Sequence, residues 1–400
     1  MSIKLSTLYS LLHDNELFEI KNNKFIKEIE TKISEDITIS DIKDYDCDLK
    51  LIFISSGGSE GLFLNNYKYL KPPIYILTSG ENNSLAASLE ILTYLNNENV
   101  KSEIIHGDID YVAQRIKALE QIEYVKRKMK DLNFGVIGKP SDWLIASIPN
   151  YLNVKEKFGI NLIDIDIDEL VNNYNRSDLY NNLSDKLYNT NYDKKFDRIE
   201  INKAENVNKA LMKIVDKYKL NGLTIRCFDL LSKINTTGCL GIAQLNDLGI
   251  CSSCEGDIMG LITMMIASLI TKKATFLANP SRIDPIKNEI VFAHCTVPFS
   301  MLDDYEFCTH FESKIGLAIR GKMKEEDVTI FRIASDLKRY FVSEGKIINN
   351  LREDGLCRTQ IKIKFEENVS ELLTKPCGNH YVIFYGHYAK AIKDLMDGIL

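Results

Sequence analysis

The sequence predicts an α/β protein with two doubly wound parallel-sheet domains followed by a β-rich C-terminal domain. Apolar β-rich runs alternate with amphipathic helical runs over the first two thirds of the chain, and short β-rich runs with few helices follow from about residue 280. A length of 400 residues also exceeds what one hydrophobic core usually serves. We predict domains at residues 1–132, 133–279 and 280–400.

The first domain is predicted to alternate strands with helices. Its expected strands are short apolar runs, and its expected helices carry apolar residues at three- and four-residue spacing. Strands separated by helices of this length favour a parallel sheet. The strands are Leu49–Ser55, Ile74–Thr78 and Lys101–His106, and the helices are Asn83–Asn96 and Ile109–Leu132.

The alternation continues in the second domain, and the pattern changes to short strands in the third. In the second domain we expect strands at Phe134–Ile137, Asn161–Ile167, Leu223–Cys227 and Ala274–Ala278, and helices at Lys203–Tyr218 and 255–272. The polar segment Asn172–Asp197 is expected to form irregular surface structure or short helices. In the third domain the expected strands are Glu289–His294, Asp327–Ile333, Tyr340–Val342, Gln360–Lys364 and Tyr381–Tyr385, and a helix follows from Ala389.

Composition and charge exclude several classes of function. With 45% hydrophobic and 26% charged residues, the chain has the composition of an ordinary globular protein. The formal net charge is −6, and acidic and basic residues are mixed along the chain, so we expect no nucleic-acid partner. The most apolar stretch, Ile258–Ile270, is too short to cross a bilayer. We expect a buried core helix there and no membrane association.

The N-terminus and the cysteines favour a cytoplasmic protein. Met1–Asn15 lacks the charged head, apolar run and cleavage site of a signal peptide. Nine cysteines are scattered without the density of a disulfide scaffold, as is typical of a reducing compartment. Cys251 and Cys254 form a CxxC, but no second CxxC or CxxH follows at zinc-finger spacing. We therefore expect neither a structural zinc site nor a thioredoxin-like redox role.

Three polar clusters lie at the ends of predicted strands, where open α/β sheets bind their ligands. Ser56–Gly61 contains glycines that would let a ligand approach the backbone, but it matches neither GxGxxG nor a P-loop, so a plain turn is the alternative. Cys254–Asp257 opens the apolar helix. Ser252 and Glu255 have the spacing of a capping box, whereas a carboxylate fixed at a helix start is also well placed to bind a metal or move a proton.

The third cluster contains two histidines that flank one predicted strand. His380 and His387 are seven residues apart, so in a regular strand they point to opposite faces and do not bind one ion together. A single histidine is more often a hydrogen-bonded structural residue than a ligand, and the same alternative holds for His294 at the end of another strand. No nucleophile elbow, HExxH or nucleotide fingerprint occurs. The residue pattern alone indicates an α/β protein with a polar cleft.

At these clusters the sequence resembles the L-fucose isomerase-like family of sugar isomerases, within the L-fucose/L-arabinose isomerase superfamily. The CExD that opens the apolar helix and the final GNH…YGH are fairly specific in combination. The resemblance touches most of the chain between residues 50 and 390, in the family's order. The matching stretches are Ser56–Glu60, Asn83–Glu90, Gly135–Ser147, Cys254–Thr263, Phe276–Arg282, Phe292–Pro298 and Gly378–His387.

The resemblance implies two α/β domains, a β-rich C-terminal domain, and a divalent ion, typically Mn²⁺, held by a Glu, an Asp and a His. The family's Glu falls on Glu255 and its His on His380, whereas its Asp falls on Asn279. An amide carbonyl still coordinates a hard cation, but it brings no charge and is no base near pH 7. We therefore expect these three residues to converge in one cleft and to bind Mn²⁺ or another divalent cation weakly or not at all.

The family reaction interconverts an aldose and a ketose through an ene-diol, so the resemblance implies a small sugar as substrate and Glu255 as a proton-transfer group. With Asn279 in the site Glu255 needs another carboxylate partner. The nearest candidates in sequence are Asp257, Asp284 and Glu289, of which Asp257 is the expected second catalytic residue. The residues expected to bind substrate are Trp143, Asn279, Arg282, His294, Asn379 and His387.

Two alternatives stand beside an active isomerase. The chain is then either a sugar enzyme with a different reaction on the same scaffold, or a sugar-binding or regulatory protein without catalysis. The family's habit also implies a homo-oligomer, in which Gly57–Glu60 or Asn83–Ser84 of the first domain reaches the cleft of a neighbouring subunit.

Overall fold

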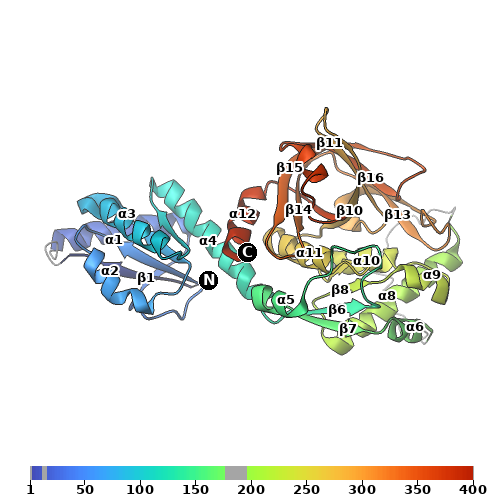
Figure 1. Ribbon diagram of the computed structural model, residues 1–400, viewed down its shortest axis with the longest axis horizontal. Helices are drawn as coiled ribbons and strands as arrows, with labels where there is room; N and C mark the ends of the chain where they lie inside the picture. Colours follow the sequence, from blue (N-terminus) through green and yellow to red (C-terminus); the bar gives the residue numbers. More distant parts are fainter. Residues whose placement is uncertain (1, 11–15, 176–195, 400) are drawn as a thin grey trace. The chain divides into compact units, whose positions relative to one another are not determined.

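The computed structural model describes residues 2–10, 16–175 and 196–399, which form two compact units, Met1–Arg127 and Lys128–Leu400 (Figure 1). Both units contain a parallel sheet, and the second also contains a closed antiparallel barrel. The predicted α/β class with a β-rich C-terminal part is therefore confirmed. Within the described residues, no helix is long and apolar enough to cross a membrane.

The first unit is a five-stranded parallel sheet in the order β2-β1-β3-β4-β5. Its strands are β1 (Ile3–Leu8), β2 (Ile37–Ile39), β3 (Leu49–Ile54), β4 (Ile74–Leu77) and β5 (Ser102–Ile105). Its helices are α1 (Glu16–Ile33), α2 (Glu60–Asn66), α3 (Ser84–Asn97) and α4 (Ile109–Met129), with short 3₁₀ turns at Tyr67–Tyr69 and Glu81–Asn83. The backbone N–H of Gly57 donates to the carbonyl of Asn82, so the polar turns after β3 and β4 lie side by side.

The sequence-based expectation lacks strand β1 and helix α1. Polar residues interrupt the apolar pattern of β1, and they are satisfied by partners that are distant in sequence. Lys4 Nζ donates to the carboxylate of Asp44 at 2.8 Å, and the buried Ser6 hydroxyl donates to the carbonyl of Ser40. Because these contacts form only in the folded protein, the local pattern does not reveal a strand that lies between β2 and β3.

The second unit begins with a four-stranded parallel sheet in the order β7-β6-β8-β9. Its strands are β6 (Asn133–Ile137), β7 (Asn161–Ile165), β8 (Gly222–Ile225) and the unexpected β9 (Cys251–Ser253). The helices are α5 (Tyr151–Phe158), α6 (Ile167–Asn175), α8 (Arg198–Tyr218), α9 (Phe228–Ile234), α10 (Cys239–Asp247) and α11 (Ile258–Thr271). Of the segment expected to form irregular structure or short helices, 172–175 belongs to helix α6, and 176–195 lies outside the described residues.

A closed antiparallel barrel follows, in the order β10-β11-β16-β15-β14-β17. Its strands are β10 (Phe276–Asp284), β11 (Glu289–His294), β14 (Asp327–Ile333), β15 (Tyr340–Asn350), β16 (Thr359–Phe365) and β17 (Tyr381–Tyr385). A two-stranded sheet of β12 (Leu302–Cys308) and β13 (Ala318–Met323), 3₁₀ turns at Phe299–Met301 and Val369–Leu373, and the final helix α12 (Ala389–Ile399) complete the unit. The strand expected at Ala274–Ala278 is the start of β10, so it pairs with β17 of the barrel and not with the parallel sheet.

Helix α11 connects the sheet of the second unit to its barrel. It contacts β8 and β9 of the parallel sheet and β14 and β17 of the barrel, and Figure 1 shows it between these two layers. Most of its residues are buried, as expected for the apolar run that was predicted to be a core helix. The N-terminus of α11 therefore lies where the carboxyl end of β9 meets the barrel.

Candidate metal and sugar site

Glu255 occupies a strained turn between β9 and α11. Both Glu255 and Gly256 have left-handed backbone conformations, with φ of 63° and 72°. Gly256 has to be a glycine, because a Cβ there would lie 2.5 Å from the carbonyl oxygen of Lys139. The Glu255 carbonyl accepts a hydrogen bond from the backbone N–H of Ser141, so backbone contacts hold the turn and leave the side chain available.

The capping box expected from Ser252 and Glu255 is wrong. Ser252 lies within β9, and the N-cap of α11 is Asp257, whose carboxylate accepts from the backbone N–H of Gly260 at 2.8 Å. The side chain of Glu255 accepts instead from the indole Nε1–H of Trp143 at 2.6 Å. The local spacing suits a cap, but after the left-handed turn the N-cap is Asp257 and not Ser252, so the helix begins at Ile258.

Three neighbouring barrel strands bring the remaining side chains to Glu255. Asn279 on β10 pairs with Ala293 on β11, next to His294, while Ala278 pairs with Tyr381 on β17, next to His380. Strand register therefore gathers Asn279, His294 and His380 at one edge of the barrel. The structure brings all three together with Glu255, although His380 is 125 residues away from it in the sequence.

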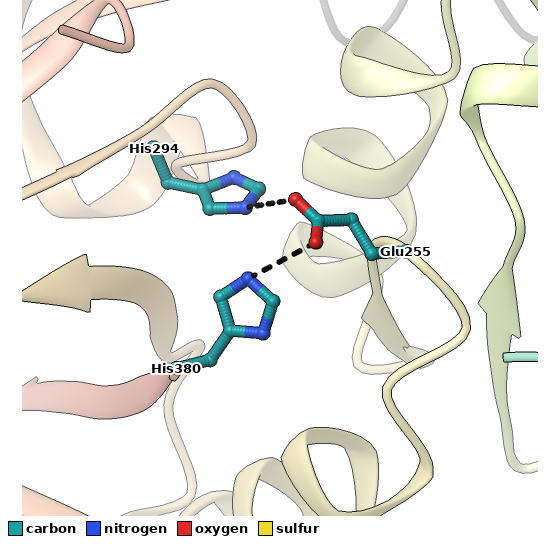
Figure 2. Close-up of side chains that lie close together, drawn as sticks. All are labelled: Glu255, His294 and His380. Carbon is teal, nitrogen blue, oxygen red and sulfur yellow. Dashed lines mark ion pairs between the residues drawn. The ribbon is translucent and has the colours of Figure 1, made fainter. Parts of the chain in front are cut away.

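The imidazoles of His294 and His380 point at the two oxygens of the Glu255 carboxylate (Figure 2). His294 Nε2 lies 3.8 Å from Oε1 and His380 Nε2 lies 3.7 Å from Oε2, which is close enough for an ion pair but too far for a hydrogen bond. Both Nε2 atoms are buried, and neither has a hydrogen-bond partner among the described residues. One ligand atom from each of the three residues lies within 4.8 Å of the others. The three residues are compatible with binding of a divalent cation.

The opposite ring nitrogens of the two histidines are fixed by hydrogen bonds. His380 Nδ1 lies 2.9 Å from Asp257 Oδ2, and since an ionised carboxylate only accepts, the ring donates. His294 Nδ1 lies 3.1 Å from the hydroxyl of Thr296. Contacts of this kind orient metal-binding histidines and leave Nε2 free to bind.

The charged groups shift one another's pKa. Burial opposes ionisation of Glu255, but His380, His294 and the Trp143 N–H outweigh it and lower the pKa of its carboxyl group to about 2. Burial opposes protonation of His380, yet Asp257 and Glu255 raise its pKa to about 9. Burial and the nearby His380 lower the pKa of His294 to about 4. With no cation bound, Glu255 is therefore ionised, His380 protonated and His294 neutral near pH 7.

A cavity of about 410 Å³ opens beside this cluster. Four residues expected to contact a sugar line it, namely Trp143, Asn279, His294 and Asn379, together with Glu255. Asn279 donates through Nδ2 to the carbonyl of Asn379 at 3.3 Å, which places its amide at the wall. The cavity has the volume of a small-molecule site.

The structure does not bring three other expected residues to the cavity wall. Asp257 is fully buried, contacts His380 and does not line this cavity. Arg282 is exposed and paired with Glu353. His387 is also exposed, and its two nitrogens contact Glu344 and Asp327. As expected from their spacing, His380 and His387 do not share a site.

Several residues of the wall were not expected from the sequence. His310 and Glu312 line the cavity from the segment between β12 and β13, which no motif marks. Five cysteines also line it: Cys227, Cys239, Cys254, Cys295 and Cys357. Cys254 contacts the Sγ of Cys227 at 3.0 Å, so its nearest thiol is not Cys251, its CxxC partner. Cys251 and Cys254 are marked by the CxxC, but the cluster becomes visible only in three dimensions.

Comparison with known proteins gives a consistent answer about the class of enzyme. No protein-family model matches the chain. The sulfoquinovose isomerase of Priestia megaterium is 24% identical over 362 residues, covering 82% of this chain and 78% of that protein. The sulfoquinovose isomerase of Alkalicoccus urumqiensis is 20% identical over 333 residues, with coverage of 78% and 74%. That of a Clostridium species is 26% identical over 204 residues, 47% of this chain and 45% of the relative.

All of these relatives are sugar isomerases by name, and the first two are aligned along most of their length. They support the expectation that the chain is an enzyme, an isomerase of the intramolecular oxidoreductase class. They are also consistent with the resemblance to L-fucose isomerase-like proteins.

Proposed function

We propose that this chain is a metal-assisted aldose–ketose isomerase for a small sugar or sugar derivative. The observation that carries the proposal is the pair of buried, unpartnered Nε2 atoms of His294 and His380, which face the Glu255 carboxylate beside a cavity of about 410 Å³. Unpartnered buried polar atoms are costly, and a bound divalent cation would satisfy both of them.

The proposed ligands are Glu255, His294 and His380, with the amide oxygen of Asn279 as an uncharged neighbour. A divalent cation there supplies Lewis-acid stabilisation of the oxyanion charge that develops on adjacent sugar oxygens. His380 must first release its Nε2 proton, because a protonated nitrogen has no lone pair to donate. Since only Glu255 brings a charge, we expect weaker binding than in a site with two carboxylates.

The proton transfer between C1 and C2 is assigned to Glu255. Its contacts keep it ionised and therefore able to accept a proton, and the Trp143 N–H fixes the direction of Oε2. Asp257 orients His380 and does not itself face a sugar. Asp284 accepts from two backbone N–H groups of its own turn and Glu289 lies 3.7 Å from Lys362, and neither lines the cavity. His310 and Glu312 are better placed as the second proton-transfer group, because both line the cavity.

The class of sugar has two candidates. The relatives act on sulfoquinovose, a sulfonated sugar, and this makes a sulfonated hexose the first substrate to test. The cavity wall favours a second candidate, an uncharged pentose or 6-deoxyhexose, because none of the described lining residues is a lysine or arginine. An anionic substituent would need donors or a cation from outside this wall.

The oligomeric state of the protein also affects which groups contact the sugar. We propose a homo-oligomer in which the polar turns at Gly57–Glu60 and Asn83–Ser84 reach a neighbouring subunit's cleft, which would supply further polar groups to the sugar. The adjacency of the two turns supports this, because it places the exposed Gly58 and Asn83 near one another on the first unit, although Ser59 and Ser84 are buried. Sedimentation of the purified protein as a monomer at micromolar concentration would contradict it.

The test combines metal analysis with a substrate screen. Trp143 is the only tryptophan of the chain and contacts Glu255, so quenching of its fluorescence by paramagnetic Mn²⁺ reports binding at this site. The Mn²⁺-loaded protein is then incubated in D₂O with sulfoquinovose, hexose phosphates, 6-deoxyhexoses and pentoses. The expected result is aldose–ketose conversion of one class, with solvent deuterium at C1 of the ketose and at C2 of the recovered aldose. Tight metal binding without turnover of any sugar would favour a sugar-binding protein, and an absence of both would refute the proposal.

A further inference from the structure

Arg332 is an arginine of barrel strand β14 that has no exposed surface. Its guanidinium donates through both terminal nitrogens to one carboxylate, with 2.8 Å from Nη1 to Asp257 Oδ2 and 3.1 Å from Nη2 to Asp257 Oδ1. Asp257 is equally buried. Burying a charged side chain costs free energy unless an oppositely charged partner forms well-aligned hydrogen bonds with it. The fold therefore places Arg332 and Asp257 together.

The partner of Arg332 is the residue that orients His380. Asp257 Oδ1 also accepts from the N–H of Gly260, and Oδ2 also accepts from His380 Nδ1. Each oxygen therefore has two donors, and Arg332 supplies one to each. Burial opposes ionisation of Asp257, but Arg332 and His380 hold its pKa well below its usual value. The carboxylate is locked in one orientation, and the ring of His380 is locked with it.

The same guanidinium touches two further parts of the site. Its Nη2 lies 3.4 Å from the hydroxyl of Ser147, on the loop that carries Trp143. It also explains the glycine that begins the GNH motif, because a Cβ at Gly378 would lie 2.9 Å from Nη2 and 3.0 Å from Nε of Arg332. One barrel residue thus contacts the helix cap, the His380 loop and the Trp143 loop.

We propose that Arg332 is a positioning residue for the metal-binding histidine: by clamping Asp257 with two hydrogen bonds, it sets the direction in which His380 Nε2 faces Glu255. The inference rests on the proposed function, since it assigns a role toward the cation of that site. Arg332 itself touches neither the cavity nor the Glu255 carboxylate. Loss of the clamp therefore weakens cation binding, and turnover falls as a consequence.

Two variants distinguish the effect of losing the two Arg332–Asp257 hydrogen bonds from the effect of losing the positive charge. Arg332→Lys keeps a positive charge beside Asp257 but cannot make the two-pronged contact. The double variant Arg332→Met/Asp257→Asn removes both buried charges. The single amide oxygen introduced at position 257 can accept from Gly260 or from His380 but not from both, because these two donors contact different carboxylate oxygens of Asp257. Arg320→Lys, which alters an arginine–glutamate pair between β13 and β12 outside the cavity, serves as the control. Mn²⁺ affinity is measured by Trp143 fluorescence and calorimetry, and the visible absorption of bound Co²⁺ reports ligand geometry.

We expect Arg332→Lys and the double variant to remain folded and to bind Mn²⁺ about 10- to 100-fold more weakly, with a changed Co²⁺ spectrum, while Arg320→Lys matches the parent. If only one of the two variants folds, its Mn²⁺ affinity and Co²⁺ spectrum decide whether Arg332 has the positioning role. Affinity within twofold of the parent and an unchanged Co²⁺ spectrum overturn the positioning role while leaving the proposed function intact. A parent protein that binds no Mn²⁺ refutes the metal site itself, and the role of Arg332 with it.

Discussion

Two clusters in the second unit place a histidine and carboxylate oxygens close enough to share an ion. In the first, Glu255, His294 and His380 face one another at the edge of the barrel, and in the second, Glu344 and Glu366 lie with His387. By distance alone the two are equivalent. They differ in burial, because both histidines of the first cluster are buried, whereas His387 and Glu366 are exposed.

The difference in hydrogen bonding is more informative than the distances. In the first cluster one nitrogen of each imidazole makes a hydrogen bond, and the other is buried without a partner in the described part of the chain. In the second cluster both nitrogens of His387 are in contact with carboxylates, at 2.7 Å to Glu344 and 3.3 Å to Asp327. In a ligand-binding site, oriented histidine nitrogens have no hydrogen-bond partner within the protein. In a surface ion-pair network, each histidine nitrogen already contacts a carboxylate. The matched clusters let single substitutions test this distinction.

The largest expected effect is the loss of turnover in Glu255→Gln, by about 10³-fold or more. Gln keeps the size and can still accept from Trp143, but it cannot take up a proton. The fold should survive, because the backbone of Glu255 makes the contacts of the turn. The matched control is Glu344→Gln in the exposed cluster, which should leave sugar conversion unchanged. Full activity of Glu255→Gln on a true substrate would remove the distinction between the two clusters.

A smaller effect is expected from Trp143→Phe. The indole N–H donates to the ionised Glu255 at 2.6 Å, and hydrogen bonds to charged groups contribute roughly 1.5–3 kcal/mol. Because Trp143 is half exposed, we expect the low end of this range, a fall in kcat/KM of about tenfold. Ile145→Ala, on the same loop and 89% exposed, is the control. Equal activity of the two variants would mean that Glu255 needs no orienting donor.

Asn279→Asp is expected to strengthen metal binding at the first cluster. A second carboxylate beside the first cluster adds attraction for a divalent cation, and we expect affinity to rise about tenfold, or about 1.4 kcal/mol. The gain is limited because the Asn279 amide gives up its hydrogen bond to the carbonyl of Asn379. Asn349→Asp, which adds the same charge at an exposed position of β15, is the control. Calorimetric titration with Mn²⁺ that shows no difference between the two would place Asn279 outside the metal's reach.

The sequence predicts the parts of this site that short motifs mark, and it misses those that strand register creates. Glu255, Asn279 and His380 follow from the resemblance, and the structure gathers them. His294 was expected to bind substrate, but its position in the metal-binding set was not expected, because that position depends on β10, β11 and β17 lying side by side. Arg332 carries no local signal at all, since its partner Asp257 is 75 residues away. His387 was expected to bind substrate but does not line the cavity. A motif shows that a residue is near a strand end, but not which face of the barrel that residue occupies.

The smallest effect is expected from His387→Gln in the exposed cluster. Hydrogen bonds to Glu344 and Asp327 raise the pKa of His387 above the value of 6.5 that the free side chain has. Protonated His387 therefore stabilises the folded state fully below about pH 6.5, and this contribution is lost as the pH rises through the higher pKa of the folded protein. Thermal unfolding should show the variant slightly less stable than the parent at pH 5.5 and equal to it at pH 9. Because the group is exposed and screened, salt should reduce the difference in stability between the variant and the parent.

A cation site would behave in the opposite way, since Mn²⁺ would stabilise the parent over the variant at high pH, where His387 is neutral. Such metal-dependent stabilisation, persisting in a Glu255→Gln background, would show that the second cluster also binds a cation.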